Sequence, residues 1–158
     1  MQDAVVAETL NPGNIKTWPD RNDLSAFRAR GGKLITYHGQ QDQQITSFNT
    51  ARWYQHFLLL LSDDPPRTTT TEEDLDAFLR VFRISGMFHC AAGPGAWVIG
   101  QGGDEKMYAG VPFERSHNVL AAIVAWVEDG APPETMTGTK FVDDDHTKGT
   151  AFERRHCR

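Results

Sequence analysis

The stretch KLITYHGQQD, residues 33–42, decides the fold class that the sequence predicts. Its first six residues are rich in β-branched and aromatic side chains, with little alternation of polar and apolar positions. That pattern is typical of a strand buried on both faces of a parallel sheet. The strand runs into a polar loop, residues 38–44. Because open α/β sheets place their sites beyond the carboxyl ends of strands, Asp42 is a candidate site residue.

A second stretch, VFRISGMFHCAAGPGAW (residues 81–97), repeats this arrangement. Residues 81–85 predict a strand, and the glycines and proline of residues 86–95 force a loop. The loop presents His89, which is followed at once by Cys90. A histidine held off the end of a strand is a common way to present a base.

The other elements complete a strand, helix, helix, strand, helix order, which predicts one partial α/β domain over residues 1–158 with a mostly parallel sheet. Only two strands are convincing. Residues 1–22 predict an irregular arm, and residues 143–158 a polar surface tail. Capping residues and apolar periodicity predict helices over 24–30, from Thr46 or Ser47 to 61, over 71–80, and from Ser116 to 129. A last strand is expected over 139–142.

Composition excludes several classes of protein. With 158 residues, 39% hydrophobic and 23% charged, the chain has the size and balance of one soluble globular domain. A net charge of −5 argues against a nucleic-acid partner, which needs a basic face. The lysines and arginines are scattered, and the longest apolar run, residues 57–61, is far too short to span a bilayer. Neither a nucleic acid nor a membrane is therefore expected as a partner.

The first residues, MQDAV, lack the basic start and apolar stretch of a signal peptide, which alone predicts an intracellular protein. The sequence contains two cysteines, Cys90 and Cys157. This count permits one disulfide but does not require it.

Asp42 and His89 together suggest acyl-transfer chemistry. An aspartate that accepts a hydrogen bond from the imidazole would fix its tautomer and leave the other nitrogen free as a base. In α/β-hydrolases the order along the chain is Ser, then Asp or Glu, then His. The Gly-x-Ser-x-Gly nucleophile motif is absent from the sequence. The alternative is that Asp42 caps the following helix and that His89 is a structural loop residue.

Five segments resemble the C-terminal part of the tannase/feruloyl esterase family: NPGN (11–14), RGGKLI (30–35), YHGQQD (37–42), GMFHCAAGPG (86–95) and WVEDG (126–130). The resemblance extends from about residue 11 to residue 158. It implies a secreted α/β-hydrolase that cleaves phenolic-acid esters, such as gallate or ferulate esters. The implied partner is therefore a small phenolic ester.

The resemblance also implies residue roles. Asp42 would orient the catalytic histidine, and His89 would be the general base. Cys90 would form a disulfide with a cysteine directly before the nucleophilic serine, which would hold the serine loop against the histidine loop. Cys157 would be half of a second disulfide whose partner lies further along the family sequence.

Departures from the family pattern limit what this chain does alone. The family's Gly-Cys-Ser-x-Gly-Gly segment, oxyanion-hole loop and calcium-binding lid are not in the sequence. No cofactor is therefore expected here, and Ala92 stands where the family commonly has glycine. We expect a fragment or a truncated gene model that is inactive by itself. Exposed sheet edge and apolar helix faces would favour self-association.

Two other classes of function are open at this point. A non-catalytic remnant or binding module could hold a phenolic ring with Tyr37, Phe88 and Trp97, although such residues more often serve packing. A metal-binding domain could use the adjacent His-Cys pairs at 89–90 and 156–157 together with residues 143–146. Structural zinc sites usually use spaced pairs instead.

Overall fold

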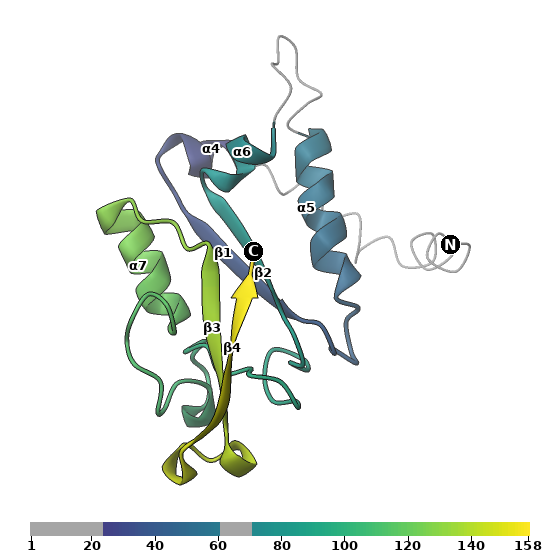
Figure 1. Cartoon of the computed structure of the whole chain (residues 1–158). Coiled ribbons are helices and arrows are strands. Elements are labelled where there is room, and N and C mark those ends of the chain that lie inside the picture. The colour runs from purple at the N-terminus through teal and green to yellow at the C-terminus, as the bar shows by residue number, and fades with distance from the viewer. Residues whose placement is uncertain (1–23, 61–70) are drawn as a thin grey trace, which may run out of the picture.

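The computed structural model describes residues 24–60 and 71–158. The predicted arm, residues 1–22, lies outside these residues, as does Asp23, the residue expected to cap the helix predicted over 24–30. Figure 1 shows two long helices, α5 (Phe48–Leu60) and α7 (Val119–Asp129), on opposite sides of the strands. A short helix, α4 (Ser25–Ala29), precedes the first strand. The described residues also contain the short helix α6, treated below, and three 3₁₀ turns: η1 (Glu105–Met107), η2 (Val142–Asp144) and η3 (His146–Lys148).

The two predicted strands exist and pair in parallel. Strand β1 is Leu34–Gly39 and β2 is Leu79–Ile84. Their register matches Leu34 with Leu79 and Gly39 with Ile84, so the two strands begin and end level. The loops that follow them therefore start side by side at one edge of the sheet.

The short helix before β2 confirms one local prediction and corrects another. Helix α6 (Glu72–Asp76) begins with a capping box, in which Thr71 accepts from the Asp74 amide and Asp74 accepts from the Thr71 amide. The helix was expected to reach residue 80, but it ends at Asp76. Leu79 instead begins β2 and is fully buried, because strand pairing with β1 and core burial outweigh the helical tendency of these residues.

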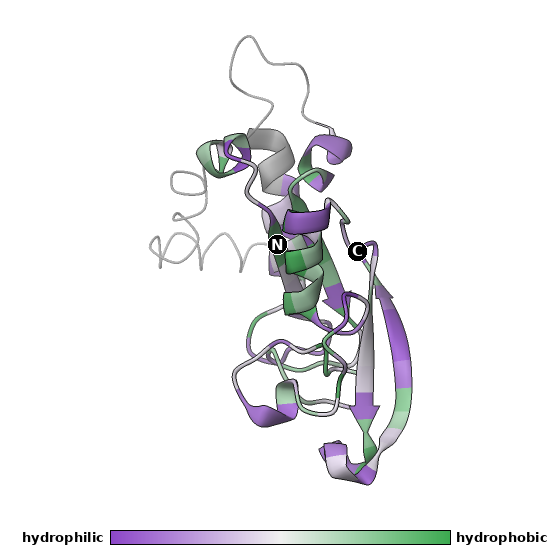
Figure 2. Cartoon of the chain, turned by 90° about the vertical axis from the view of Figure 1, so that its left-hand side faces the viewer, coloured by the Kyte–Doolittle hydropathy of each residue, from purple (hydrophilic) through white to green (hydrophobic). Residues whose placement is uncertain are grey.

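The C-terminal region corrects the expected sheet and the expected tail. Strands β3 (Thr135–Phe141) and β4 (Thr150–Cys157) form an antiparallel pair, so the described residues contain one parallel and one antiparallel two-stranded sheet rather than a mostly parallel one. Strand β4 is exposed at every position except His156, and Figure 2 shows its largely hydrophilic composition. A strand without an apolar face carries no periodic signal in the sequence, which is why it resembled a tail.

Helix α7 ends as predicted but presents a different face to the core. Gly130 terminates it in the left-handed region at φ 65°, while Asn118, not Ser116, caps its first turn. Its buried residues are Ala121, Ala122 and Trp126. Apolar periodicity predicts that a stripe of aliphatic residues faces the core: Val119, Leu120, Ile123, Val124 and Val127. Three of them, Leu120, Val124 and Val127, are exposed instead. Trp126 is the largest of the buried side chains of this helix.

The core has two parts. One lies around Leu75, Phe78 and Leu79 against α4 and α5. The larger part joins β2, β3, α7 and the segment after the His89 loop, and its buried members are Phe82, Ile84, Met87, Trp97, Val98, Ile99, Ala122, Met136 and Phe141.

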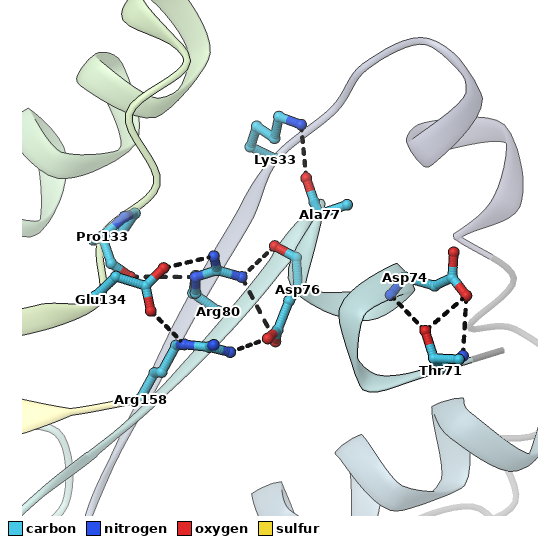
Figure 3. Close-up of polar contacts among 9 residues, drawn as sticks. All are labelled: Lys33, Thr71, Asp74, Asp76, Ala77, Arg80, Pro133, Glu134 and Arg158. Atoms are coloured by element: carbon cyan, nitrogen blue, oxygen red, sulfur yellow. Dashed lines mark hydrogen bonds and ion pairs between the residues drawn. The ribbon is translucent and has the colours of Figure 1, made fainter.

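Arg80 ties the two sheets together at the far end from the loops (Figure 3). It is 5% exposed, its guanidinium lies over the Trp126 ring, and it donates to the Pro133 carbonyl and the Glu134 carboxylate at 3.2 and 3.0 Å. Arg158 extends the network by pairing with Asp76 and Glu134. A buried charge of this kind is tolerated only because its donors are satisfied.

Within residues 24–60 and 71–158, no helix combines the length and the hydropathy that crossing a bilayer would require.

Candidate active site

The two loops that follow β1 and β2 are joined by their backbones. The Gln40 amide donates to the Ile84 carbonyl and the Gln41 amide to the Met87 carbonyl, both at 3.0 Å. Gly39 makes this approach possible, because a Cβ atom there would overlap the carbonyl oxygen of Phe88. The level ends of the strands and this glycine bring the two predicted site residues to the same place.

Asp42 and His89 meet at this edge. Nδ1 of His89 lies 2.8 Å from Oδ2 of Asp42. The carboxylate is buried, with its side chain 1% exposed, whereas the imidazole is 37% exposed. The contact requires Nδ1 to carry the proton, which leaves Nε2 as the unprotonated nitrogen of the neutral ring. Nε2 has no hydrogen-bond partner in the part of the chain that the structure describes.

The Asp42 carboxylate accepts four hydrogen bonds. Oδ1 accepts from the amides of Gln44 and Ile45, both at 2.8 Å, and Oδ2 accepts from His89 and from Nε2 of His38 at 3.2 Å. Burial raises the pKa of this carboxyl group. The bonds from the Ile45 amide, His89 and the Gln44 amide outweigh burial and hold its pKa well below the usual range. Asp42 is therefore an anion at neutral pH.

The alternative interpretation, that Asp42 caps the following helix, is wrong, although the carboxylate does have a local structural role. Its Oδ1 does close a turn through the Gln44 and Ile45 amides. Helix α5 begins only at Phe48, so these amides do not belong to the helix that Asp42 was expected to cap. The turn uses one carboxylate oxygen and leaves the other for the two histidines.

His38 is a member of the site that sequence reasoning missed. It is 8% exposed, and its Nε2 faces two acceptors, Asp42 and the Ile45 carbonyl at 3.1 Å. Nε2 therefore carries the proton, and Nδ1 accepts from the Thr50 hydroxyl at 2.6 Å. Its position at the end of the predicted strand, four residues before Asp42, was the available signal.

The His89 loop, residues 85–96, is held by its own backbone and by side chains from elsewhere. The Phe88 amide donates to the Ala92 carbonyl at 3.1 Å, and Gly95 donates to Gly86 at 3.0 Å. The Lys140 ammonium donates to the Gly93 carbonyl at 2.6 Å. These contacts hold the loop in a closed shape that does not depend on the His89 side chain.

The two cysteines are exposed free thiols and are not bonded to each other. The disulfides expected for Cys90 and Cys157 need partners outside the described residues and stay predictions.

The three aromatic candidates differ in their placement. Phe88 is 37% exposed beside His89, and Tyr37 is half-buried, with burial and then the nearby Cys90 raising the pKa of its hydroxyl. Trp97 does not fit the expectation of a substrate contact. It is 3% exposed in the core, where its indole N–H donates to Asp144 at 2.8 Å.

The metal-binding alternative is not supported by the geometry. Over residues 24–60 and 71–158, no three His, Cys, Asp or Glu side chains come close enough to hold a metal ion. His156, one of the proposed ligands, is buried and bonded through Nε2 to the Ala96 carbonyl oxygen at 3.0 Å.

A buried aspartate bonded to a partly exposed histidine, at the carboxyl ends of two parallel strands, is an arrangement that can hold a histidine as a general base. Comparison with known proteins identifies the family. The family model for tannase and feruloyl esterase matches residues 17–157. The chain belongs to the tannase and feruloyl esterase family.

Relatives are longer than this chain. A protein of Aspergillus flavus named probable feruloyl esterase B-2 is 54% identical over 158 residues, which are 100% of this chain and 28% of the relative. Two crystal structures from Aspergillus oryzae are also similar. An esterase matches with TM-score 0.78 and 41% identity, and feruloyl esterase B with TM-score 0.75 and 35% identity. Each match covers 99% of this chain and 28% of the longer one.

Proposed function

We propose that this chain supplies the base and its orienting carboxylate to the active site of a carboxylic ester hydrolase. The observation that carries the proposal is the 2.8 Å contact between Nδ1 of His89 and Oδ2 of Asp42, with the other imidazole nitrogen unpartnered among the described residues. Membership of a family of ester hydrolases supports this role. The nucleophilic serine comes from polypeptide outside the 158 residues.

In the proposed mechanism, Nε2 of His89 removes the proton from the serine hydroxyl as its oxygen attacks the ester carbonyl. The resulting imidazolium then gives that proton to the leaving alcohol as the carbon–oxygen bond of the ester breaks. A water molecule then attacks the acyl group on the serine, with His89 again acting as the base, and this step releases the acid. Asp42 stays ionised throughout and stabilises the imidazolium, which its low pKa permits.

The substrates we propose are esters of phenolic acids, of the ferulate or gallate type. The names of the relatives support this class. Phe88 and Tyr37 lie beside His89 and Cys90, respectively, and offer aromatic surface that could stack on a phenolic ring.

We further propose that Cys90 bonds to a cysteine next to the nucleophilic serine and that the intact protein is exported to an oxidising compartment. The exposed thiol of Cys90, one residue from His89, supports this pairing. Cys90→Ser in the complete site would then loosen the serine loop and lower kcat without disturbing the contact between Asp42 and His89.

A graft tests the proposed function. Residues 1–158 replace the matching segment of the Aspergillus oryzae feruloyl esterase B, and the hydrolysis of methyl ferulate and methyl gallate is measured. We expect turnover by the graft, loss of turnover in the His89→Ala graft, and none with the isolated chain. A folded but inactive graft would contradict the proposal, as would turnover by the isolated chain that His89→Ala abolishes.

A matched control keeps the result specific. His117 is a second histidine with a carboxylate neighbour, since its Nε2 lies 3.8 Å from Glu153, but it lies outside the two site loops. The His117→Ala graft should retain the activity of the unaltered graft.

A further inference from the structure

The two ends of the His89 loop lie against one side chain from the C-terminal strand. At the start of the loop, the Ser85 amide nitrogen lies 3.4 Å from Nδ1 of His156. At its end, the Ala96 carbonyl oxygen lies 3.0 Å from Nε2 of the same ring. The bond to the Ala96 carbonyl is the shorter of the two and therefore the stronger. One imidazole therefore bridges the neck of the loop that presents the catalytic base.

The bridge fixes the chemical form of the ring. Nε2 faces a carbonyl oxygen and must carry the proton, while Nδ1 faces an amide N–H and must accept. Only neutral His156 in this tautomer satisfies both partners. The residue is 3% exposed and is the one buried position of β4, whose other seven residues are exposed.

Strand β3 leaves room for this bridge. A Cβ atom at Gly138 would overlap the Ala96 carbonyl oxygen and would lie 2.8 Å from Nε2 of His156. Gly138 has an ordinary negative φ, so glycine is not needed there for backbone conformation. The absence of a side chain at this position serves the close approach of Ala96 and His156 instead.

We propose that His156 is a positioning residue that closes the neck of the His89 loop and thereby sets the place of His89 relative to Asp42. It touches neither residue and acts through Ser85 and Ala96. The consequence for catalysis rests on the proposed function, while the consequence for the loop does not.

The surroundings of the ring favour its neutral form. Burial lowers the pKa of His156 by more than the bond to the Ala96 carbonyl raises it, and the nearby Arg154 lowers it a little further. The ionisable groups that line the same hollow add positive charge and one thiol: Arg83, Arg154, Arg155, Cys157 and Arg158. Strand β3 contributes Met136, which is the register partner of His156, and Gly138. No carboxylate in this set favours the imidazolium.

The first test uses the wild-type 158-residue chain and needs no variant. The ¹⁵N shifts of the imidazole nitrogens report the tautomer of each histidine at neutral pH. We expect His156 to carry its proton on Nε2. A proton on Nδ1, or an imidazolium at pH 7, would overturn the proposal because the Ser85 amide would then face a second donor.

Two substitutions of similar size then separate bonding from packing. His156→Gln retains a donor and an acceptor on a planar group, whereas His156→Met fills the space without either. We expect hydrogen exchange of the Phe88 and Gly95 amides to rise about tenfold in the Met variant, the effect of losing roughly one hydrogen bond. The Gln variant should stay within about threefold of wild type.

The distribution of the effect decides the outcome. Amides of β1 should be unaffected, and His117→Gln should change none of these rates. Equal acceleration of β1 and the loop in the Met variant, or equal behaviour of the Gln and Met variants, would overturn a local role. Gly138→Ala should repeat the Met result, because its methyl group displaces Ala96 from the ring.

The same variants in the feruloyl esterase graft test the link to catalysis. We expect His156→Met to lower kcat about tenfold with little change in KM, as misplacement of a base predicts, and His156→Gln to restore it. An inactive graft with His156 intact would count against the proposed function alone, since the exchange measurements on the isolated chain still decide the role of His156 in the loop.

Discussion

Nδ1 of His89 lies 2.8 Å from Oδ2 of Asp42, although 47 positions separate the two residues along the chain. The parallel register of β1 and β2 explains the meeting, because it places the carboxyl ends of both strands at one level. The remaining hydrogen bonds of Asp42 go to two amides and to His38, so every lone pair of the carboxylate is engaged. This arrangement supports the first three predictions.

Asp42→Asn in the feruloyl esterase graft should lower kcat by about 10⁴, because an amide in place of the carboxylate favours the wrong tautomer of His89 and cannot stabilise the imidazolium. Steady-state kinetics on methyl ferulate measures the change. Asp74→Asn is a matched control, since this aspartate belongs to the capping box of α6, which precedes β2 and lies outside the two site loops. A loss of less than tenfold in the Asp42 variant would remove that residue from its proposed role.

Asp42 should also make the stability of the isolated chain depend on pH. Its pKa is lower when folded than the value of about 3.9 typical of an unfolded chain. The stabilisation is therefore fully present above about pH 4–5 and is lost as the pH falls toward the folded value. Denaturant unfolding of wild type and Asp42→Asn from pH 7 to pH 3 should show a difference in unfolding free energy that shrinks with acidity. A constant difference would contradict this linkage.

His38→Leu should destabilise the chain by about 1–3 kcal/mol, because it strips a donor from Asp42 and the Ile45 carbonyl and an acceptor from the Thr50 hydroxyl. The pKa of Asp42 should rise when the bond from His38 is lost. Carboxyl ¹³C shifts measured against pH would report that pKa. Thr50→Val breaks only the outer bond and should leave the pKa of Asp42 unchanged, and equal effects of both substitutions would be inconsistent with direct support of the carboxylate.

Ala92→Gly should stabilise the isolated chain by about 1 kcal/mol. Ala92 adopts φ 59°, a left-handed conformation that costs roughly 1–2 kcal/mol for a residue with a Cβ atom, and part of the gain is lost to the greater freedom of glycine in the unfolded chain. Ala91 has no positive φ, so Ala91→Gly should destabilise instead. Thermal unfolding of the two variants should give shifts of opposite sign, and shifts of the same sign would argue against strain at position 92.

Arg80→Met should cost about 3 kcal/mol, because it leaves the buried Pro133 carbonyl without its donor and removes the cation from the Trp126 face. Arg158 contacts the carboxylates of Asp76 and Glu134, but its side chain is 38% exposed. Arg158→Met should therefore cost less than about 1 kcal/mol. Chemical denaturation measures both changes in unfolding free energy. A larger loss of stability in the Arg158 variant would contradict the expectation that the buried Arg80 contributes more.

Local signals in the sequence predicted the elements that depend on local chemistry. The β-branched run at residues 33–38 became β1, Thr71 capped α6 and Gly130 ended α7, because each depends on neighbouring residues alone. The pair of Asp42 and His89 was also predictable, since a parallel strand pair and two polar loops suffice to place it.

Features decided by distant packing were not predictable. Strand β4 exists because its backbone pairs with β3, while its exposed polar side chains give no pattern. In α7, Trp126 packs inward with the Arg80 guanidinium over its ring, while aliphatic residues such as Leu120 face outward, an arrangement that periodicity does not encode. Trp97 resembled a pocket residue until its bond to Asp144 and its burial were known.

Because β1 and β2 end level, the number of residues that follow each strand determines where the site side chains lie. Asp42 stands three residues past Gly39, and His89 five past Ile84. One inserted residue in either short loop could displace a side chain by roughly 3.3–3.6 Å, more than a hydrogen bond tolerates. Added length between the two strands moves neither end and costs only a slowly growing closure entropy. Natural or engineered variants of this protein should therefore accept length changes between Asp42 and the start of β2, and reject them in the few positions that separate each strand from Asp42 or His89.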